Sequence, residues 1–117
     1  MKNKFIYNDL NGLVNGRVLV INPLTFKAIL DTYNEAFSGM EVFLWTDDLN
    51  EQNKFDPMVY KGVFISDDKD KHWYFEIKDD KKIKHLSESD EFKDYSLLDI
   101  IGEKEYKIIQ NKNPEWL

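Results

Sequence analysis

The sequence contains no cysteine, which excludes disulfide bonds, thiolate metal sites and cysteine nucleophiles. Arginine is nearly absent too, since Arg17 is the single one in the chain. No apolar run approaches the roughly 20 residues that a membrane-spanning helix needs. Residues 1–5 carry lysines without a following apolar stretch, so the sequence predicts no secretory signal. From these absences we expect a protein of the cytoplasm.

Linkers, internal repeats and low-complexity tracts are also missing, which predicts a single domain over residues 1–117. What is present suits a folded chain, because 42% of the residues are hydrophobic and 15% are aromatic.

Negative charge is concentrated in two segments. The chain has 22 acidic and 16 basic side chains, a net charge of −6. Residues 46–57 have a net charge of −3 and residues 86–105 one of −5, while the rest of the chain is close to balanced. Fields of this sign repel nucleic acid and attract basic surfaces. The sequence therefore predicts a basic protein partner and no direct binding of nucleic acid or membrane.

The first part of the chain, residues 4–21, reads as two strands joined by a tight turn. Asn11-Gly12 and Asn15-Gly16 are both able to form that turn, and the sequence does not choose between them.

A helix is predicted next. Asn22 is a good N-cap and Pro23 suits the first helical position. Apolar residues then recur at helical spacing as far as Phe37, and Ser38-Gly39 would end the helix.

Residues 58–65 and 72–78 have the alternation of a β-hairpin, preceded by a strand at 40–45 and a long polar loop at 46–57. The predicted register pairs Ile65 with His72, Phe64 with Trp73, Gly62 with Phe75 and Tyr60 with Ile77. A third strand at 82–86 would then complete a charged ladder of Lys61, Glu76 and Lys84.

The hairpin interpretation replaces a calcium-binding one for residues 66–79. An EF-hand loop starting at Asp68 would place Trp73 where a glycine must turn the chain and Asp79 where a glutamate is needed. The same register separates His72 from His85, which disfavours a metal site built on the two histidines. No nucleophile elbow, phosphate loop, HExxH motif or dinucleotide fingerprint is present, so we expect no enzyme activity, no cofactor and no bound metal.

The last third of the chain is the least determined. Ser87 and Asp90 form a potential capping box before a short helix or turn at 88–95. Residues 97–101 and 106–110 are predicted as strands, with a helix as the open alternative for 97–101, because apolar runs this short do not discriminate. We expect Trp116 either to be held against the body of the protein or to contact a partner.

Together these elements predict an α+β fold: a strongly bent antiparallel sheet of five to seven strands, with a small barrel as the closed alternative, and one main helix packed on it. The predicted core consists of Val18, Val20, Phe26, Leu30, Tyr33, Phe37, Val42, Leu44, Tyr60, Phe64, Trp73, Phe75, Ile77 and Ile83.

For function, we expect a small acidic protein-binding module of the inhibitor or immunity type, in which the two acidic segments lie together and steer onto a basic partner. An aromatic side chain would supply a buried anchor. The predicted partner-binding residues are Trp45, Asp47, Asp48, Glu51, Phe55, Asp90, Glu91, Asp94 and Tyr95. One alternative is a phage or mobile-element accessory protein that self-associates through Val63, Tyr74 and Leu86. Another is a small-ligand module lined by Tyr60, Trp73 and His85.

Overall fold

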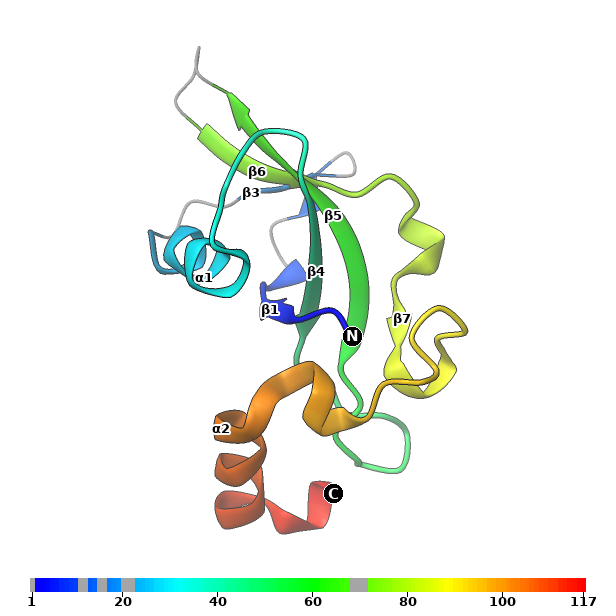
Figure 1. The fold of residues 1–117 in the computed structure, drawn as a ribbon. Helices are drawn as coiled ribbons and strands as arrows, with labels where there is room; N and C mark the ends of the chain where they lie inside the picture. The colour runs from blue at the N-terminus through cyan, green and yellow to red at the C-terminus, as the bar shows by residue number, and fades with distance from the viewer. Residues whose placement is uncertain (1, 11–12, 15–16, 20–22, 68–71) are drawn as a thin grey trace.

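A mixed β-sheet forms the centre of the molecule (Figure 1). The structure is a computed structural model, which describes residues 2–10, 13–14, 17–19, 23–67 and 72–117. The strands are β1 (Phe5–Tyr7), β2 (Leu13–Val14), β3 (Arg17–Leu19), β4 (Glu41–Thr46), β5 (Met58–Asp67), β6 (His72–Glu76) and β7 (Lys84–His85). The helices are α1 (Pro23–Tyr33) and α2 (Leu97–Lys112), with short 3-10 turns at Asp80–Lys82, Leu86–Glu88 and Pro114–Trp116. The strand order is β1-β4-β5-β6-β3-β2, and β7 also pairs with β5.

This arrangement confirms the α+β class and corrects three finer expectations. The sheet is not purely antiparallel, because β1 pairs with β4 in parallel, with Ile6 opposite Leu44. It is open rather than closed into a barrel, because β1 and β2 are the two ends of the strand order and do not pair with each other. The sheet is also not strongly curled. The described residues form two α-helices instead of one main helix.

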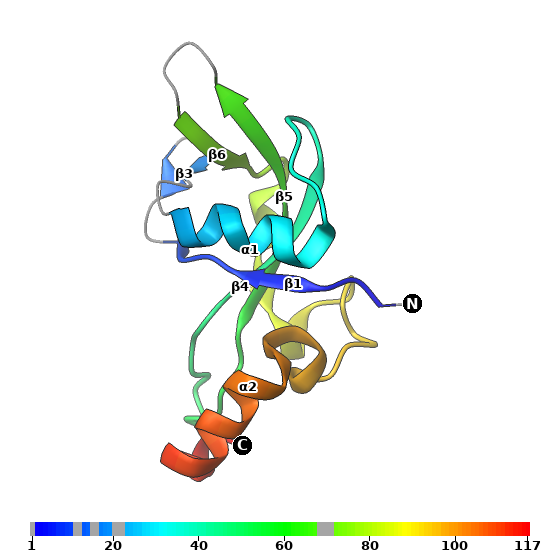
Figure 2. The ribbon, with the colours of Figure 1, turned by 60° about the vertical axis from the view of Figure 1, so that its left-hand side comes forward.

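The two helices cover opposite faces of the sheet (Figure 2). On one face, Ile29 of α1 belongs to a buried cluster with Val42 and Leu44 of β4. On the other, Ile101 of α2 belongs to a cluster with the neighbouring β4 residue Trp45. Successive side chains of a strand point to opposite faces, so β4 serves both cores.

The chain between β1 and α1 differs from the predicted hairpin. β1 pairs with neither β2 nor β3; instead these two strands pair with each other, with Val14 opposite Arg17. β3 then lies antiparallel to β6. The two Asn-Gly pairs lie outside the described residues, as does Asn22.

α1 begins at Pro23 as predicted but ends earlier than Ser38-Gly39. Asn34 adopts a left-handed conformation with φ of 62°, and its N–H donates to the carbonyl of Leu30 at 2.8 Å. This is the αL C-cap, which asparagine tolerates better than most residues. The helix therefore ends at Asn34, five residues before the glycine at which the sequence predicted its end.

The β5–β6 hairpin is confirmed, whereas its register is wrong by two residues. Phe64 lies opposite Phe75 and Asp67 opposite His72, so the strands pair further towards the tip than predicted. A two-residue shift keeps every side chain on its predicted face. Trp73 accordingly lies on the α1 side, where it stacks on Phe26 with 4.6 Å between ring centroids, and His72 is exposed.

Gly62 retains its packing role despite the shift. It lies opposite Val42 of β4, and a methyl group at this position would meet the Cβ atom of Phe75 at 3.2 Å. The side chains of Leu44 and Ile77 would lie at 3.2 and 3.3 Å from the same methyl group. The apolar face that the sequence predicted thus closes over this glycine from three sides.

The predicted third strand pairs with a different neighbour. β7 joins β5, with Lys84 opposite Val59, at the part of the edge that β6 leaves free. Glu76 lies opposite Val63, and Lys61 forms an ion pair with Glu91 at 2.9 Å. The ladder of Lys61, Glu76 and Lys84 is therefore not formed.

The strands predicted at 97–101 and 106–110 are wrong, because both segments belong to α2. The helix starts with a capping box, in which the side chains of Ser96 and Asp99 each accept a bond from the other residue's backbone N–H. Gly102, with φ of 85° and ψ of 163°, kinks it after one turn. The helix alternative for 97–101 is the correct one, and the cap is at Ser96 rather than Ser87.

Most of the predicted core is confirmed. Val42, Leu44, Tyr60, Phe64, Phe75 and Ile77 are buried, and Phe26, Tyr33 and Ile83 pack against them. The core assignment is wrong for Leu30, Phe37 and Trp73, whose exposed fractions are 40%, 52% and 37%. The side chains of Val18 and Val20 lie outside the described part of the chain. Neither helix of the described residues is long and apolar enough to cross a membrane.

Candidate functional site

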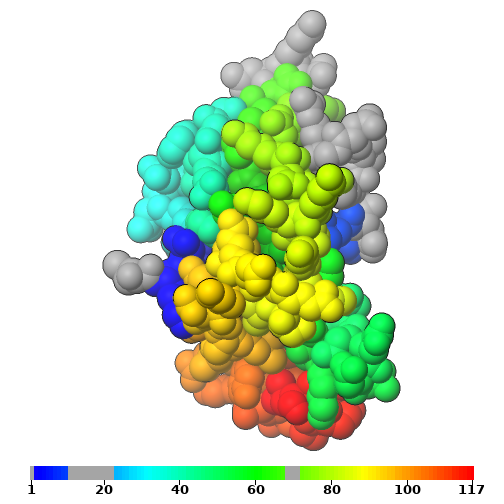
Figure 3. Space-filling model, turned by 90° about the vertical axis from the view of Figure 1, so that its right-hand side faces the viewer, coloured from blue at the N-terminus to red at the C-terminus, as the bar shows by residue number. Residues whose placement is uncertain are grey.

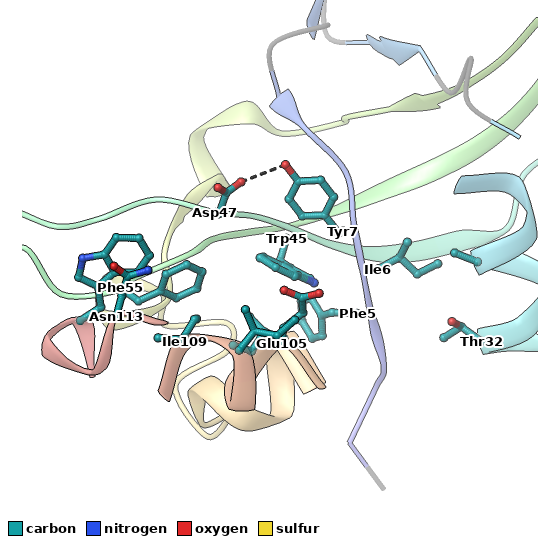
Figure 4. A pocket seen from close by; sticks show the side chains of 14 residues that line it. Phe5, Ile6, Tyr7, Thr32, Trp45, Asp47, Phe55, Glu105, Ile109 and Asn113 are labelled. Carbon is teal, nitrogen blue, oxygen red and sulfur yellow. Dashed lines mark hydrogen bonds between the residues drawn. The ribbon is translucent and has the colours of Figure 1, made fainter. Parts of the chain in front are cut away.

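A wide hollow follows the outer edge of β1 (Figure 4). It has a volume of about 580 Å³. We call it the edge groove and define it by its lining residues: Phe5, Ile6, Tyr7, Ala28, Thr32, Trp45, Asp47, Phe55, Ile101, Glu105, Ile108, Ile109, Asn113 and Trp116. Its walls are α1 on one side and α2 on the other.

β1 brings all three of its residues to the groove. Their side chains serve different cores: Ile6 packs into the α1 cluster, and Phe5 packs against the α2 cluster. Since neighbouring side chains of a strand leave on opposite faces, a hollow lined by three successive residues must pass along the strand's edge. Among the described residues, no strand pairs with that edge.

Aromatic rings form one side of the edge groove. Tyr7 and Trp45 meet edge to face with 4.9 Å between centroids, Trp45 and Phe55 lie at 6.4 Å, and Phe55 and Trp116 stack at 6.3 Å. The backbone N–H of Phe55 donates to the carbonyl of Trp116 at 2.8 Å, which holds the C-terminal turn against the loop after β4.

The groove is negatively charged. Asp47 and Glu105 are among its fourteen lining residues, which include no lysine, arginine or histidine. In Figure 4 the two carboxylates lie on either side of the Trp45 ring. The hydroxyl of Tyr7 donates to one oxygen of Asp47 at 3.0 Å. Partial burial, followed by this bond and the charge of Asp47, raises the pKa of Tyr7, so the hydroxyl keeps its proton.

A second, smaller hollow adjoins the groove at Tyr7 and Asp47. Its volume is about 370 Å³, and its lining adds Asp9 and Asp48 to the carboxylates nearby. The carboxylate of Asp48 is also hydrogen-bonded to Nε2 of His85 at 2.8 Å. The negative surface therefore extends beyond the groove along the start of the loop that follows β4.

Three of the predicted binding residues, Trp45, Asp47 and Phe55, line the groove, and Asp48 lines the adjoining hollow. Trp45 is only 7% exposed, so it is part of the wall and not a protruding anchor. The other predicted residues, Glu51, Asp90, Glu91, Asp94 and Tyr95, do not line it. Tyr95 instead packs on Phe5, and its hydroxyl accepts the backbone N–H of Asn3 at 2.9 Å.

The two acidic segments touch where the second one begins (Figure 3). Asp56, which is buried, accepts bonds from the backbone and hydroxyl of Ser87, and the N–H of Leu86 donates to Pro57 at 2.8 Å. This carboxylate is used inside the fold. Glu91 is likewise paired with Lys61, so only part of the acidic excess is left to meet a partner.

The strip predicted for self-association is not formed. Tyr74 is 8% exposed, Leu86 packs against the α2 cluster, and Val63 lies opposite Glu76 and Glu41. The predicted small-ligand lining is dispersed too, since Tyr60 is buried with its hydroxyl bonded to the carbonyl of Asn8. His85 lies beside Asp48.

Sequence reasoning missed Tyr7, Glu105, Ile108 and Trp116 as members of one site. They come from β1, α2 and the final turn, which are far apart in sequence. The one sequence signal for any of them was the expectation that Trp116 either packs against the body of the protein or contacts a partner. Within the described ranges, no group of three histidine, aspartate or glutamate side chains is placed to hold a metal ion.

The fold and the groove thus define an open α+β domain with an acidic, aromatic-walled site at one edge of its sheet. Comparisons with protein-family models, with curated proteins and with solved structures give no match for this chain.

Proposed function

We propose that the protein is a small protein-binding module of the inhibitor or immunity type, and that it engages a basic part of a partner protein through the edge groove. The observation that carries the proposal is the composition of the groove wall: two carboxylates and five aromatic rings without a basic side chain. Aromatic faces and carboxylates together attract ammonium and guanidinium groups.

Asp47 and Glu105 are suited to this role because their charge is not neutralised within the fold. The ion pairs of the described residues involve Asp99, Glu91, Asp48 and Glu103. Asp47 gives one oxygen to the Tyr7 hydroxyl, which leaves the other oxygen for a cation. A basic side chain entering here would also cover the Trp45 ring, and buried aromatic contacts carry much of the free energy of many protein interfaces.

The test uses a blocked pentapeptide in which lysine alternates with threonine. Binding is followed by tryptophan fluorescence, to which Trp45 and Trp116 in the groove and Trp73 outside it contribute. The double variant Asp47→Asn/Glu105→Gln keeps the shapes and the Tyr7 bond and should weaken binding by about tenfold, since each ion pair at a partly exposed site contributes up to about 1 kcal/mol. The matched control, Asp90→Asn/Asp94→Asn, removes the same charge outside the groove and should change the affinity by less than about twofold.

Two results would contradict the proposal. Equal losses from the two double variants would mean that net charge, and not the groove, attracts the peptide. Equal affinity for a simple diamine and for the peptide would favour a small-ligand module, because a protein segment would then add nothing to the cation.

A further inference from the structure

Resting on that function, we propose that the occupant of the edge groove is an extended basic segment of the partner, which pairs with β1 as an additional strand of the sheet. The argument starts from the backbone of β1. A strand at the edge of a sheet presents unpaired N–H and C=O groups, which are the usual template for such an addition.

The contacts of Lys4 and Asn8, the two residues that flank β1, fix which backbone groups of the strand point outward. The N–H of Asn8 donates to Trp45 of β4 at 2.9 Å, and the carbonyl of Asn8 accepts the Tyr60 hydroxyl at 2.7 Å. At the start of the strand, the carbonyl of Lys4 accepts the Tyr33 hydroxyl at 2.6 Å, and that hydroxyl also accepts the N–H of Phe43 at 3.1 Å. The even-numbered residues therefore face β4.

Because backbone groups alternate along a strand, those of Phe5 and Tyr7 face away from β4 and into the groove. A segment lying in the groove can bond to both residues. β1 has three residues, which corresponds to about 10 Å of extended chain at the usual rise per residue. The site is thus long enough for a short strand and is bounded by a helix on each side.

The two walls differ, which predicts the side-chain pattern of the segment. Towards α1 the wall consists of Ala28 and Thr32, which are small and uncharged. Towards α2 it includes Glu105 and Ile108, together with the Trp45 ring of β4 and the nearby Asp47. Side chains of an added strand alternate between these walls. We therefore expect basic or aliphatic residues on every second position and small residues between them.

The charge of the groove argues against a second copy of this chain as the occupant. β1 reads Phe5-Ile6-Tyr7 and carries no basic residue. Pairing of two β1 strands would bring together Asp47 and Glu105 of both copies, four carboxylates with only the Lys4 that precedes each strand nearby to offset them, because Lys2 is paired with Asp99. Like charges at a partly buried interface repel.

Two N-methylated forms of the lysine–threonine pentapeptide test strand addition. One carries methyl groups on two lysine amides, the other on two threonine amides, so that only one set faces β1. The form whose methyl groups face β1 should lose affinity by about tenfold or more, because two backbone hydrogen bonds are removed. The other form should bind within about twofold of the parent peptide, because its amides face solvent. Equal effects of the two patterns would overturn strand addition.

Amide hydrogen exchange provides a second test of strand addition, measured on the backbone of the protein itself. In the free protein the N–H of Asn8 should exchange slowly, and those of Phe5 and Tyr7 quickly. Saturating peptide should slow Phe5 and Tyr7 by about tenfold or more, the effect expected of a newly formed backbone hydrogen bond.

The outcomes separate the two proposals. Binding that depends on Asp47 and Glu105 without slower exchange at Phe5 and Tyr7 would overturn strand addition and leave the protein-binding function standing. Absence of lysine-dependent binding would overturn both. Slower exchange at Phe5 and Tyr7 on raising the protein concentration alone would identify a second copy as the occupant and overturn the inference.

Discussion

The side chain of Phe75 has no exposed surface and lies in the cluster that joins α1 to the sheet. Phe75→Ala should lower the free energy of unfolding by about 3–5 kcal/mol, because it leaves a cavity and removes buried apolar surface. Urea unfolding followed by circular dichroism measures this.

Trp73→Ala, a truncation two residues away at a side chain that is 37% exposed, is the matched control and should cost clearly less. A loss below about 1 kcal/mol for Phe75→Ala would mean that this face of the sheet does not carry the core.

Tyr33 and Trp45 illustrate what single residues reveal and conceal in a sequence. Both were correctly recognised as aromatic residues on ordered elements. The Tyr33 hydroxyl bridges Lys4 and Phe43, and Trp45 forms part of the groove wall instead of protruding as an anchor. Both facts depend on contact partners that the local sequence pattern does not contain. Residue type predicts the chemistry of a side chain, while its contacts come from the tertiary fold.

At the scale of elements, the start of α2 is governed by Asp99. The ammonium of Lys2 at 2.7 Å, together with the backbone and hydroxyl of Ser96, lowers the pKa of this carboxyl from 3.8 to about 2. A lowered pKa means that the charged form stabilises the fold above pH 4, and that this stabilisation is lost as the pH falls from about 4 towards 2.

A titration of the Asp99 carboxyl carbon by NMR checks this directly, with an expected midpoint near pH 2. Lys2→Met should move the midpoint upward towards 3.8, since the bond from Lys2 is the largest cause of the shift. A midpoint that stays in place in this variant would refute the assignment to Lys2.

The kink in α2 gives a second prediction at this scale. Gly102 has φ of 85° and ψ of 163°, a combination that is essentially restricted to glycine. Gly102→Ala should therefore destabilise the protein by about 1–3 kcal/mol, as residues forced into sparsely populated conformations do. Thermal and urea unfolding measure the loss.

Lys104→Ala, an exposed change two residues further along the helix, should stay within about 0.5 kcal/mol of the parent. An equally stable Gly102→Ala protein would mean that α2 straightens at no cost.

How well each element could be predicted depended on how local its signals are. Pro23 with the following apolar spacing indicated α1, and alternation indicated β5 and β6 on their correct faces. The parallel pairing of β1 with β4 has no local signal, because the partners are separated by the whole of α1. The apolar runs of α2 fit a strand or a helix equally, and the Ser96–Asp99 capping box, which decides for a helix, was overlooked.

The same reasoning applies to the site. Asp47 and Phe55 could be found from an acidic loop of unusual length. Glu105 could not, because its position opposite Asp47 exists only once α2 has packed beside β1.

At the scale of the whole molecule, the uneven charge should govern how quickly a partner arrives. Raising the salt from about 0.01 M to 1 M shortens the Debye length from about 30 Å to 3 Å. The association rate of the lysine–threonine peptide should then fall by about tenfold or more, with a smaller change in dissociation, because screening acts mainly on encounter. Stopped-flow fluorescence measures both rates.

Reversing Asp47 and Asp48 to lysine should lower the association rate more than it raises the dissociation rate. Reversing Asp90 and Asp94 serves as the control for net charge. A rate that does not respond to salt would mean that the carboxylates near the groove do not steer the partner.

The edge groove joins Phe5, near the beginning of the chain, to Trp116, near its end. Contacts of such high sequence separation form late in folding, because the intervening chain must be ordered first. On the ribosome, residues 5–7 would wait unpaired until β4 had emerged, and the groove would be complete only after residue 116 had left the exit tunnel. The capacity to bind would then appear only after all the described strands and both helices have been made, and it would be lost when either β1 or the turn at Pro114–Trp116 detaches.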